Sequence, residues 1–180
     1  MTTAQEIQDR GVRLFQRKDY EEASRAFAQA QSLYETDGKP DMAAEMQVNI
    51  ALVHRALSEH QQALEIMQTA VRTFQQMNDR KRMAMALGNL GGVYAVMGDH
   101  EQAYSSYRTA ADIFDEIGEK KLHGETLVAM GALQVKNGKL GAGAASYEVG
   151  LSELDSLSPS QRILKGLIGI RNRITGQTND

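Results

Sequence analysis

The chain has 180 residues, of which 42% are hydrophobic and 24% charged, a balance typical of a folded domain and too apolar for a disordered segment. Its length suits one domain or one short solenoid, and its formal net charge of -3 gives no excess of cations to draw it to nucleic acid. The absence of cysteine excludes disulfides, thiolate zinc sites and cysteine nucleophiles. Because no stretch approaches the ~18 apolar residues that span a bilayer and the N-terminus lacks a signal-peptide core, we expect a cytoplasmic protein without membrane insertion.

The sequence repeats with a period of 40 residues, and each repeat predicts two antiparallel helices. One column of the first helix holds small residues: Gly11, Ala51, Gly91 and Gly131. The second helix has small columns that begin at Ala23 and Ala30. Between these lies a column of large residues: Phe27, Met67, Tyr107 and Tyr147. Because small residues allow two helix axes to approach to ~8–10 Å, these columns predict four helical hairpins.

The expected boundaries follow from the same period. In chain order the hairpins are predicted at about 4–40, 41–80, 81–120 and 121–157, with a fifth, unpaired helix at about 159–175. Residues 1–176 form a single solenoid in this interpretation, and 176–180 form a loose tail.

The fifth helix is predicted to cap the solenoid. Ser158 before Pro159 is a suitable N-cap followed by a first-turn proline. Another step of 40 residues puts Arg171 in the small-residue column and places the apolar columns at Leu167, Ile170 and Ile174. We therefore expect a helix whose inner face is apolar and whose outer face is charged.

This pattern resembles the tetratricopeptide repeat (TPR) family, and the 40-residue period is similar to its long-repeat branch. In the third repeat the match is carried by Leu87, Leu90, Gly91, Tyr94, Ala103, Tyr107 and Ala110. The resemblance implies an all-α fold, a right-handed α-solenoid of four TPR-like helical hairpins plus a C-terminal capping helix. It also implies that the first helices of successive repeats line a concave groove that binds another protein.

No catalytic or metal-binding constellation is found in the sequence. The four histidines have no paired ligand spacing such as HExxH, so surface positions are expected for them. The segment GKLGAG from Gly138 to Gly143 lacks the P-loop order and a preceding strand, which favours a turn and a helix start. Serines near carboxylates have no histidine base at a recognisable spacing. We therefore expect no enzyme activity, no cofactor and no metal site.

The resemblance places the candidate binding residues on exposed columns of the first helices. They are Asn49, Asn89, Val48, Leu52, Arg55, Met85, Gly88, Gly92, Val128 and Ala132. In long-repeat relatives, asparagines at the positions of Asn49 and Asn89 bond the backbone of an extended ligand, and an amide has both donors and an acceptor for this. The basic clamp with which chaperone-binding relatives hold a C-terminal carboxylate is absent. An internal segment or an amphipathic helix of the partner is therefore preferred.

The small residues Gly88, Gly92 and Ala95 form a stripe along one helix, and we expect the resulting notch to accept a bulky apolar side chain of the partner.

The leading interpretation is a non-enzymatic adaptor, scaffold or assembly factor that binds a peptide segment or helix of a partner protein in this groove. Two alternatives stay open. A tight superhelix would bury part of the apolar face by itself, and a self-associating scaffold would use that face to form a homo-oligomer. A further candidate surface is a basic edge on the inter-repeat turn, where an acidic segment of the partner would contact Arg80, Lys81 and Arg82.

Overall fold

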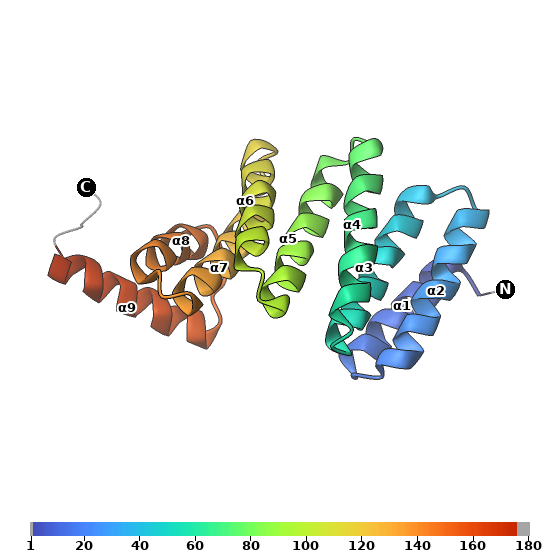
Figure 1. Ribbon diagram of the computed structural model, residues 1–180, viewed down its shortest axis with the longest axis horizontal. Coiled ribbons are helices and arrows are strands. Elements are labelled where there is room, and N and C mark those ends of the chain that lie inside the picture. The colour runs from blue at the N-terminus through green and yellow to red at the C-terminus, as the bar shows by residue number, and fades with distance from the viewer. Residues whose placement is uncertain (1, 176–180) are drawn as a thin grey trace. The chain divides into compact units, whose positions relative to one another are not determined.

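The computed structural model describes residues 2–175, and in that range every regular element is an α-helix. The helices are α1 (Ala4–Gln16), α2 (Tyr20–Thr36), α3 (Pro40–Ala56), α4 (His60–Gln76), α5 (Arg80–Met97), α6 (His100–Glu116), α7 (Lys120–Lys136), α8 (Leu140–Ser152) and α9 (Pro159–Thr175) (Figure 1). The chain divides into two compact units, Met1–Ser106 and Tyr107–Asp180. The predicted all-α solenoid of helical hairpins is confirmed, and the second helices begin 40 residues apart, at Tyr20, His60, His100 and Leu140.

The first unit is held together by the predicted large and small columns. Ala23 and Ala30 are completely buried and Phe27 is 2% exposed, on the side of α2 that packs against α1 and α3. A Cβ added to Gly11 would lie 2.7 Å from the Phe27 ring, well inside normal contact distance. The small residue in the first helix therefore makes room for the large one in the second, as the sequence predicted.

Glycine replaces alanine at the closest helix contacts of the second unit. A Cβ on Gly131 of α7 would lie 3.0 Å from the backbone oxygen of Gly143 on α8. A Cβ on Gly150 of α8 would lie 2.7 Å from the backbone oxygen of Gly124 on α7. The two helices thus pack backbone against backbone at two levels, which only glycine permits without a shift.

Each turn between α1 and α8 is built around one residue in the left-handed region, and these residues recur every 20 positions. They are Lys18, Gly38, Ser58, Asn78, Gly98, Gly118 and Gly138, with φ between 56° and 83°. Both helices of the first three repeats, and the first helix of the fourth, are therefore followed by the same kind of turn. The predicted turn in GKLGAG is confirmed, because Gly138 has φ 76° and α8 begins at Leu140.

The series stops before α9. Position 158 is an N-cap instead: the Ser158 hydroxyl accepts from the Gln161 amide at 3.3 Å, and the Gln161 side chain accepts from the Ser158 amide at 2.8 Å. This capping box, with Pro159 in the first turn, starts the predicted fifth helix. The expected loose tail at 176–180 lies outside the described residues.

The predicted inner face of α9 is wrong. Leu167 is 59% exposed and Ile170 is 55% exposed, whereas Ile168 is 7% exposed; the side chain of Ile174 lies outside the described residues. The reason is the end of α8. It stops at Ser152, whereas steps of 40 from the ends of α2, α4 and α6 would place its end at 156, so α8 offers α9 a shorter surface than the other second helices offer their neighbours.

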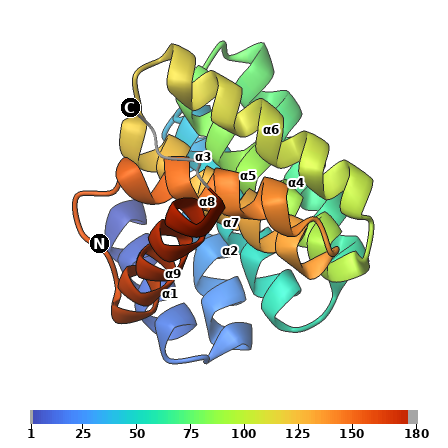
Figure 2. The ribbon, with the colours of Figure 1, turned by 90° about the vertical axis from the view of Figure 1, so that its left-hand side faces the viewer.

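The two terminal helices differ in character. On α1, Arg10 and Arg13 are exposed at the positions that Ile50 and Val53 occupy in α3. Arg10 and Arg13 therefore keep polar the side of α1 on which no earlier repeat packs, as expected of a terminal repeat. Figure 2 looks onto α9 at the other end of the chain.

Within residues 2–175, no helix has the length and apolar content needed to cross a membrane.

Candidate functional site: a groove between α3 and α5

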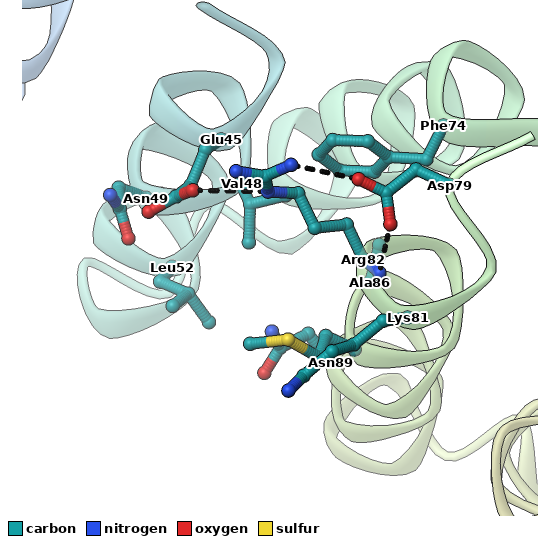
Figure 3. A pocket seen from close by; sticks show the side chains of 11 residues that line it. Glu45, Val48, Asn49, Leu52, Phe74, Asp79, Lys81, Arg82, Ala86 and Asn89 are labelled. Carbon is teal, nitrogen blue, oxygen red and sulfur yellow. Dashed lines mark hydrogen bonds and ion pairs between the residues drawn. The ribbon is translucent and has the colours of Figure 1, made fainter. Parts of the chain in front are cut away.

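A groove of about 580 Å³ lies between α3 and α5 in the first unit (Figure 3). This volume is in the range of sites that hold a small molecule or a few side chains of a peptide. Its lining residues come from α3, α5, the end of α4 and the turn before α5: Glu45, Val48, Asn49, Leu52, Phe74, Asp79, Lys81, Arg82, Met85, Ala86 and Asn89.

The groove has an apolar base. Phe74 of α4 is 1% exposed and Ala86 of α5 is 1% exposed, and both belong to a hydrophobic cluster that Val48 and Leu52 of α3 pack against. Met85 stands at the edge with 45% of its surface exposed. A methionine in such a position adapts its shape to different apolar groups, because it is unbranched and flexible.

Two asparagines face the groove from opposite helices. Asn49 lies on α3 and Asn89 on α5, and both are half-buried (Figure 3). Neither side-chain amide has a hydrogen-bond partner among residues 2–175. Each amide offers two donors and one acceptor oxygen, so the pair is suited to bond a peptide backbone laid along the groove.

Arg82 organises the acidic groups at one end of the groove. Its Nη1 lies 2.8 Å from Oδ2 of Asp79 and its Nε lies 3.4 Å from Oε2 of Glu45 (Figure 3). The same Nη1 lies 3.4 Å from Oδ2 of Asp41. One guanidinium therefore joins the start of α5 to the first two turns of α3. Such a fork holds several carboxylates at once, which a lysine ammonium does less well.

The same network continues to α1 and α2. The Tyr34 hydroxyl lies 2.7 Å from Oε1 of Gln8 and 3.2 Å from Oε1 of Gln5, and its single proton favours the shorter bond. Gln8 in turn donates from Nε2 to Oε1 of Glu45 at 3.4 Å. Burial, followed by the negative charge of Glu45, raises the pKa of Tyr34 above its ordinary value. Helices α1, α2, α3 and α5 therefore share one polar network beside the groove.

Asp79 caps α5. Its carboxylate accepts from the backbone amide of Arg82 at 2.9 Å and from the guanidinium of the same residue. Burial raises the pKa of Asp79, but these two hydrogen bonds together with the positive charge of Arg82 outweigh burial, and the pKa lies below its ordinary value. The charged carboxylate is thus the form that the fold stabilises.

The structure brings together only part of the predicted set. Seven predicted residues line the groove: Val48, Asn49, Leu52, Lys81, Arg82, Met85 and Asn89. Four others of the first unit, Arg55, Arg80, Gly88 and Gly92, are not among the lining residues, and Val128 and Ala132 belong to α7 in the second unit. A Cβ on Gly88 would meet nothing within 4 Å, so space is open beside that glycine.

The predicted basic edge has a different setting from the one expected. Arg80, Lys81 and Arg82 form the first turn of α5 rather than the turn before it. Cations at a helix N-terminus oppose the helix dipole, and Asp79 offsets this at the cap. The charge of Arg82 is directed at three carboxylates of the protein itself, so Arg82 is not presented to solvent as an isolated cation.

Four lining residues were missed by the sequence analysis: Glu45, Phe74, Asp79 and Ala86. Asp79 carried a readable signal, because an aspartate directly before a helix is a favoured N-cap. Phe74 and Ala86 look like ordinary core residues in sequence. Their role in the groove depends on how widely α3 and α5 separate, which the repeat pattern does not specify.

Two of the histidines each contact a single glutamate. Nδ1 of His54 lies 2.6 Å from Oε2 of Glu59, and Nδ1 of His123 lies 2.6 Å from Oε2 of Glu153. In the part of the chain that the structure describes, no three histidine, aspartate or glutamate side chains gather as metal ligands would.

Comparison with known proteins identifies the family. The family model described as "Soluble NSF attachment protein, SNAP" matches residues 3–157. The chain belongs to the soluble NSF attachment protein (SNAP) family. The match covers α1 to α8 and ends before α9. No curated protein matches the sequence.

Solved structures similar to this SNAP-family chain share its fold at low identity. BtubC (BKLC) from P. vanneervenii superposes with a TM-score of 0.77 at 14% identity, covering 96% of this chain and 72% of that one. The apo form of RapI gives 0.77 at 15% identity, covering 97% and 51%. Aspartyl phosphate phosphatase F from Bacillus subtilis gives 0.81 at 15% identity, covering 96% and 48%.

These similarities show the fold. The chain spans about half the length of RapI and of phosphatase F. The expected TPR-like helical repeat is confirmed at this level by the family and the structures together, and the assignment to the long-repeat branch stays a prediction.

Proposed function

We propose that this chain is a non-enzymatic adaptor that binds one segment of a partner protein in the groove between α3 and α5. The observation that carries the proposal is the pair of asparagine amides, Asn49 and Asn89, which lack protein partners and flank an apolar base. An apolar side chain of the ligand would occupy the base while the amides bond its backbone. The name of the family, an attachment protein, supports a protein ligand.

The charges around the groove favour an internal segment or a helix over a chain terminus. The groove lining holds two carboxylates, Glu45 and Asp79, and two cations, Lys81 and Arg82. Arg82 is paired with both carboxylates, so no excess of cations is available to hold a terminal carboxylate. An uncharged stretch with one or two large apolar residues fits both the base and the two amides. The protein would act as an interaction module of the cytoplasm without catalytic activity.

The experiment is site-directed photo-crosslinking followed by a binding measurement. A photoreactive amino acid at Met85, on the exposed edge of the groove, should capture the partner in a native extract, and mass spectrometry should identify the captured segment. Asn49→Ala with Asn89→Ala should then weaken binding of that segment by ~1–3 kcal/mol, because two hydrogen bonds are lost. Asn137→Ala, an exposed asparagine in the second unit, serves as the matched control.

Two results would contradict the proposal. One is a segment that crosslinks at Met85 but binds the double asparagine variant as tightly as the parent. The other is a stable homo-oligomer in light scattering that is lost in the same double variant, because the groove would then be filled by another copy of the chain.

A further inference from the structure

Helix α9 presents an uncovered apolar stripe. Ile163, Leu167 and Ile170 are 67%, 59% and 55% exposed, and their spacing of four and three residues places them on one face of the helix. We call these three residues the open stripe. The adjacent face is the covered one: Ile168 is 7% exposed, and Asn172 donates to the carboxylate of Glu148 on α8 at 3.0 Å. Helix α9 is therefore docked by one face and open on the next.

The repeat shows which kind of element covers this face elsewhere in the chain. Leu167 and Ile170 stand 40 residues after Leu127 and Met130 of α7. Both residues are covered in α7: Met130 is 8% exposed, and a Cβ on Gly150 of α8 would lie 3.1 Å from the Leu127 Cβ. In α5 the equivalent Leu87 and Leu90 pack in one cluster with Phe74 of α4, the second helix of the preceding repeat. In α9 the residues at the same positions, Leu167 and Ile170, are exposed. The open stripe is thus a face that a neighbouring second helix covers elsewhere in the chain and that is largely exposed in α9.

The charge of α9 indicates what charge a helix that covers the open stripe should carry. Between Pro159 and Thr175 there are four cations, Arg162, Lys165, Arg171 and Arg173, and no acidic residue. The second helices of this chain are neutral or acidic; α2, for example, holds three glutamates and one arginine, and α6 holds four acidic residues and one arginine. An acidic amphipathic helix therefore complements α9 both in its apolar face and in its charge.

A head-to-tail contact with another copy fits poorly. The opposite end of the chain, on α1, is lined by the exposed arginines Arg10, Arg13 and Arg17. Placing that surface against α9 would oppose cations to cations and leave the open stripe against charged side chains. The observations favour a different polypeptide.

We propose that the open stripe of α9 binds an acidic amphipathic helix of a partner protein. The surface lies outside the segment that the SNAP family model matches, and its residues are separate from those of the groove between α3 and α5. The protein would then hold its partners at two independent surfaces. Small residues in the bound helix, such as those at Ala23 and Ala30 of α2, would allow the close approach seen in the chain's own hairpins.

The test uses the full chain and a defined helical probe. The probe is a fluorescent peptide of residues 20–36, carrying Arg25→Lys and Gln29→Glu joined by a side-chain amide bridge, because a short helix is otherwise marginal in water. Both bridged positions are exposed in α2. We expect saturable binding, a loss of about tenfold or more in affinity with Leu167→Glu plus Ile170→Glu, and weaker binding at high salt.

Two control variants and one structural measurement distinguish specific binding at the open stripe from non-specific binding of the probe. Val96→Glu changes an exposed apolar residue that is 53% exposed on α5, and it should leave probe affinity unchanged. A probe with Glu21→Lys, Glu22→Lys and Glu35→Lys should bind at least about tenfold more weakly, because its charge now matches that of α9. Circular dichroism should show that the Leu167→Glu plus Ile170→Glu variant keeps its helicity, as expected for exposed positions.

Three outcomes would overturn the proposal. Absence of saturable probe binding is the first, and equal binding by the α9 variant and the parent is the second. The third is binding of the parent to vesicles of anionic phospholipid that the α9 variant loses while the probe competes with neither. That result would make α9 a basic amphipathic helix for a membrane surface.

Discussion

Nε of Arg82 on α5 lies 3.4 Å from Oε2 of Glu45 on α3, and this contact bridges one end of the groove. The two residues are 37 positions apart in sequence, and each has a second partner that fixes it: Asp79 for the arginine and Gln8 for the glutamate. The groove is therefore bounded by side chains that are already held in place before a ligand arrives. Such preorganisation reduces the entropy that binding must lose.

The cap of α5 should make stability depend on pH. The pKa of Asp79 is lowered in the folded protein, so its stabilising effect is fully present above the unfolded pKa and is lost as the pH falls through the folded value. We expect Asp79→Ala to reduce the free energy of unfolding by ~1 kcal/mol at neutral pH and by less at pH values below that folded pKa. Urea unfolding at both pH values measures the difference.

Asp79→Asn is the control for this prediction. It keeps a side-chain oxygen for the Arg82 amide but has no titrating carboxylate, so its difference from Asp79→Ala should not change with pH. A parent protein whose advantage over Asp79→Ala is the same at both pH values would contradict the proposed role of the charged carboxylate.

The sequence predicted the contacts that follow from the 40-residue period. It did not predict the contacts that depend on how far apart two helices lie. The columns around Gly11 and Phe27 determine which helices pack closely, and this is local geometry that a repeat reveals directly. The bond from Arg82 to Glu45 depends on the separation of α3 and α5, and many surface arginines and glutamates would look the same in sequence. The exposure of Leu167 and Ile170 on α9 accompanies the early end of α8 at Ser152, which no apolar column records.

A glycine at position 58 should stabilise the turn between α3 and α4. Ser58 has φ 64° in the series of left-handed turn residues, and an equivalent position in the preceding turn is Gly38. A side chain in this region costs ~1–2 kcal/mol relative to glycine, part of which is cancelled because glycine is freer in the unfolded chain. We expect Ser58→Gly to raise the free energy of unfolding by ~0.5–1 kcal/mol.

Thermal and urea unfolding would measure this gain. Ser58→Ala is the matched control and should give no gain, because alanine keeps the Cβ that strains this conformation. A melting temperature for Ser58→Gly at or below that of Ser58→Ala would show that the turn is not strained.

The close contact of α7 and α8 should be intolerant of side chains. A Cβ at Gly131 already lies 3.0 Å from the Gly143 oxygen and 3.2 Å from the Tyr147 ring, so Gly131→Leu must push the two helices apart. Overpacking of this kind typically costs ~1–3 kcal/mol. Gly166→Leu in α9 is the control within the same unit, since a Cβ there meets nothing within 4 Å. Similar melting temperatures for the two variants would place Gly131 outside the contact.

Substitutions at Gly88 can show where on α5 a partner docks. Gly88 lies in the interior of the helix, and a Cβ there would meet nothing within 4 Å. Because glycine is ~1 kcal/mol worse than alanine inside a helix, Gly88→Ala should stabilise the protein by about that amount. The lining of the groove includes Asn89 but not Gly88, so the same change should leave binding of a captured groove ligand unaltered.

Gly88→Leu with Gly92→Leu separates the two surfaces that α5 offers. If the partner occupies the groove between α3 and α5, the double variant keeps its affinity while Asn49→Ala with Asn89→Ala loses it. Loss of affinity in the double leucine variant, with helicity unchanged and the asparagine variant binding normally, would instead assign the partner to the notch beside Gly88 and Gly92. Isothermal titration of both variants against the captured segment distinguishes these results, since the two sets of side chains do not overlap.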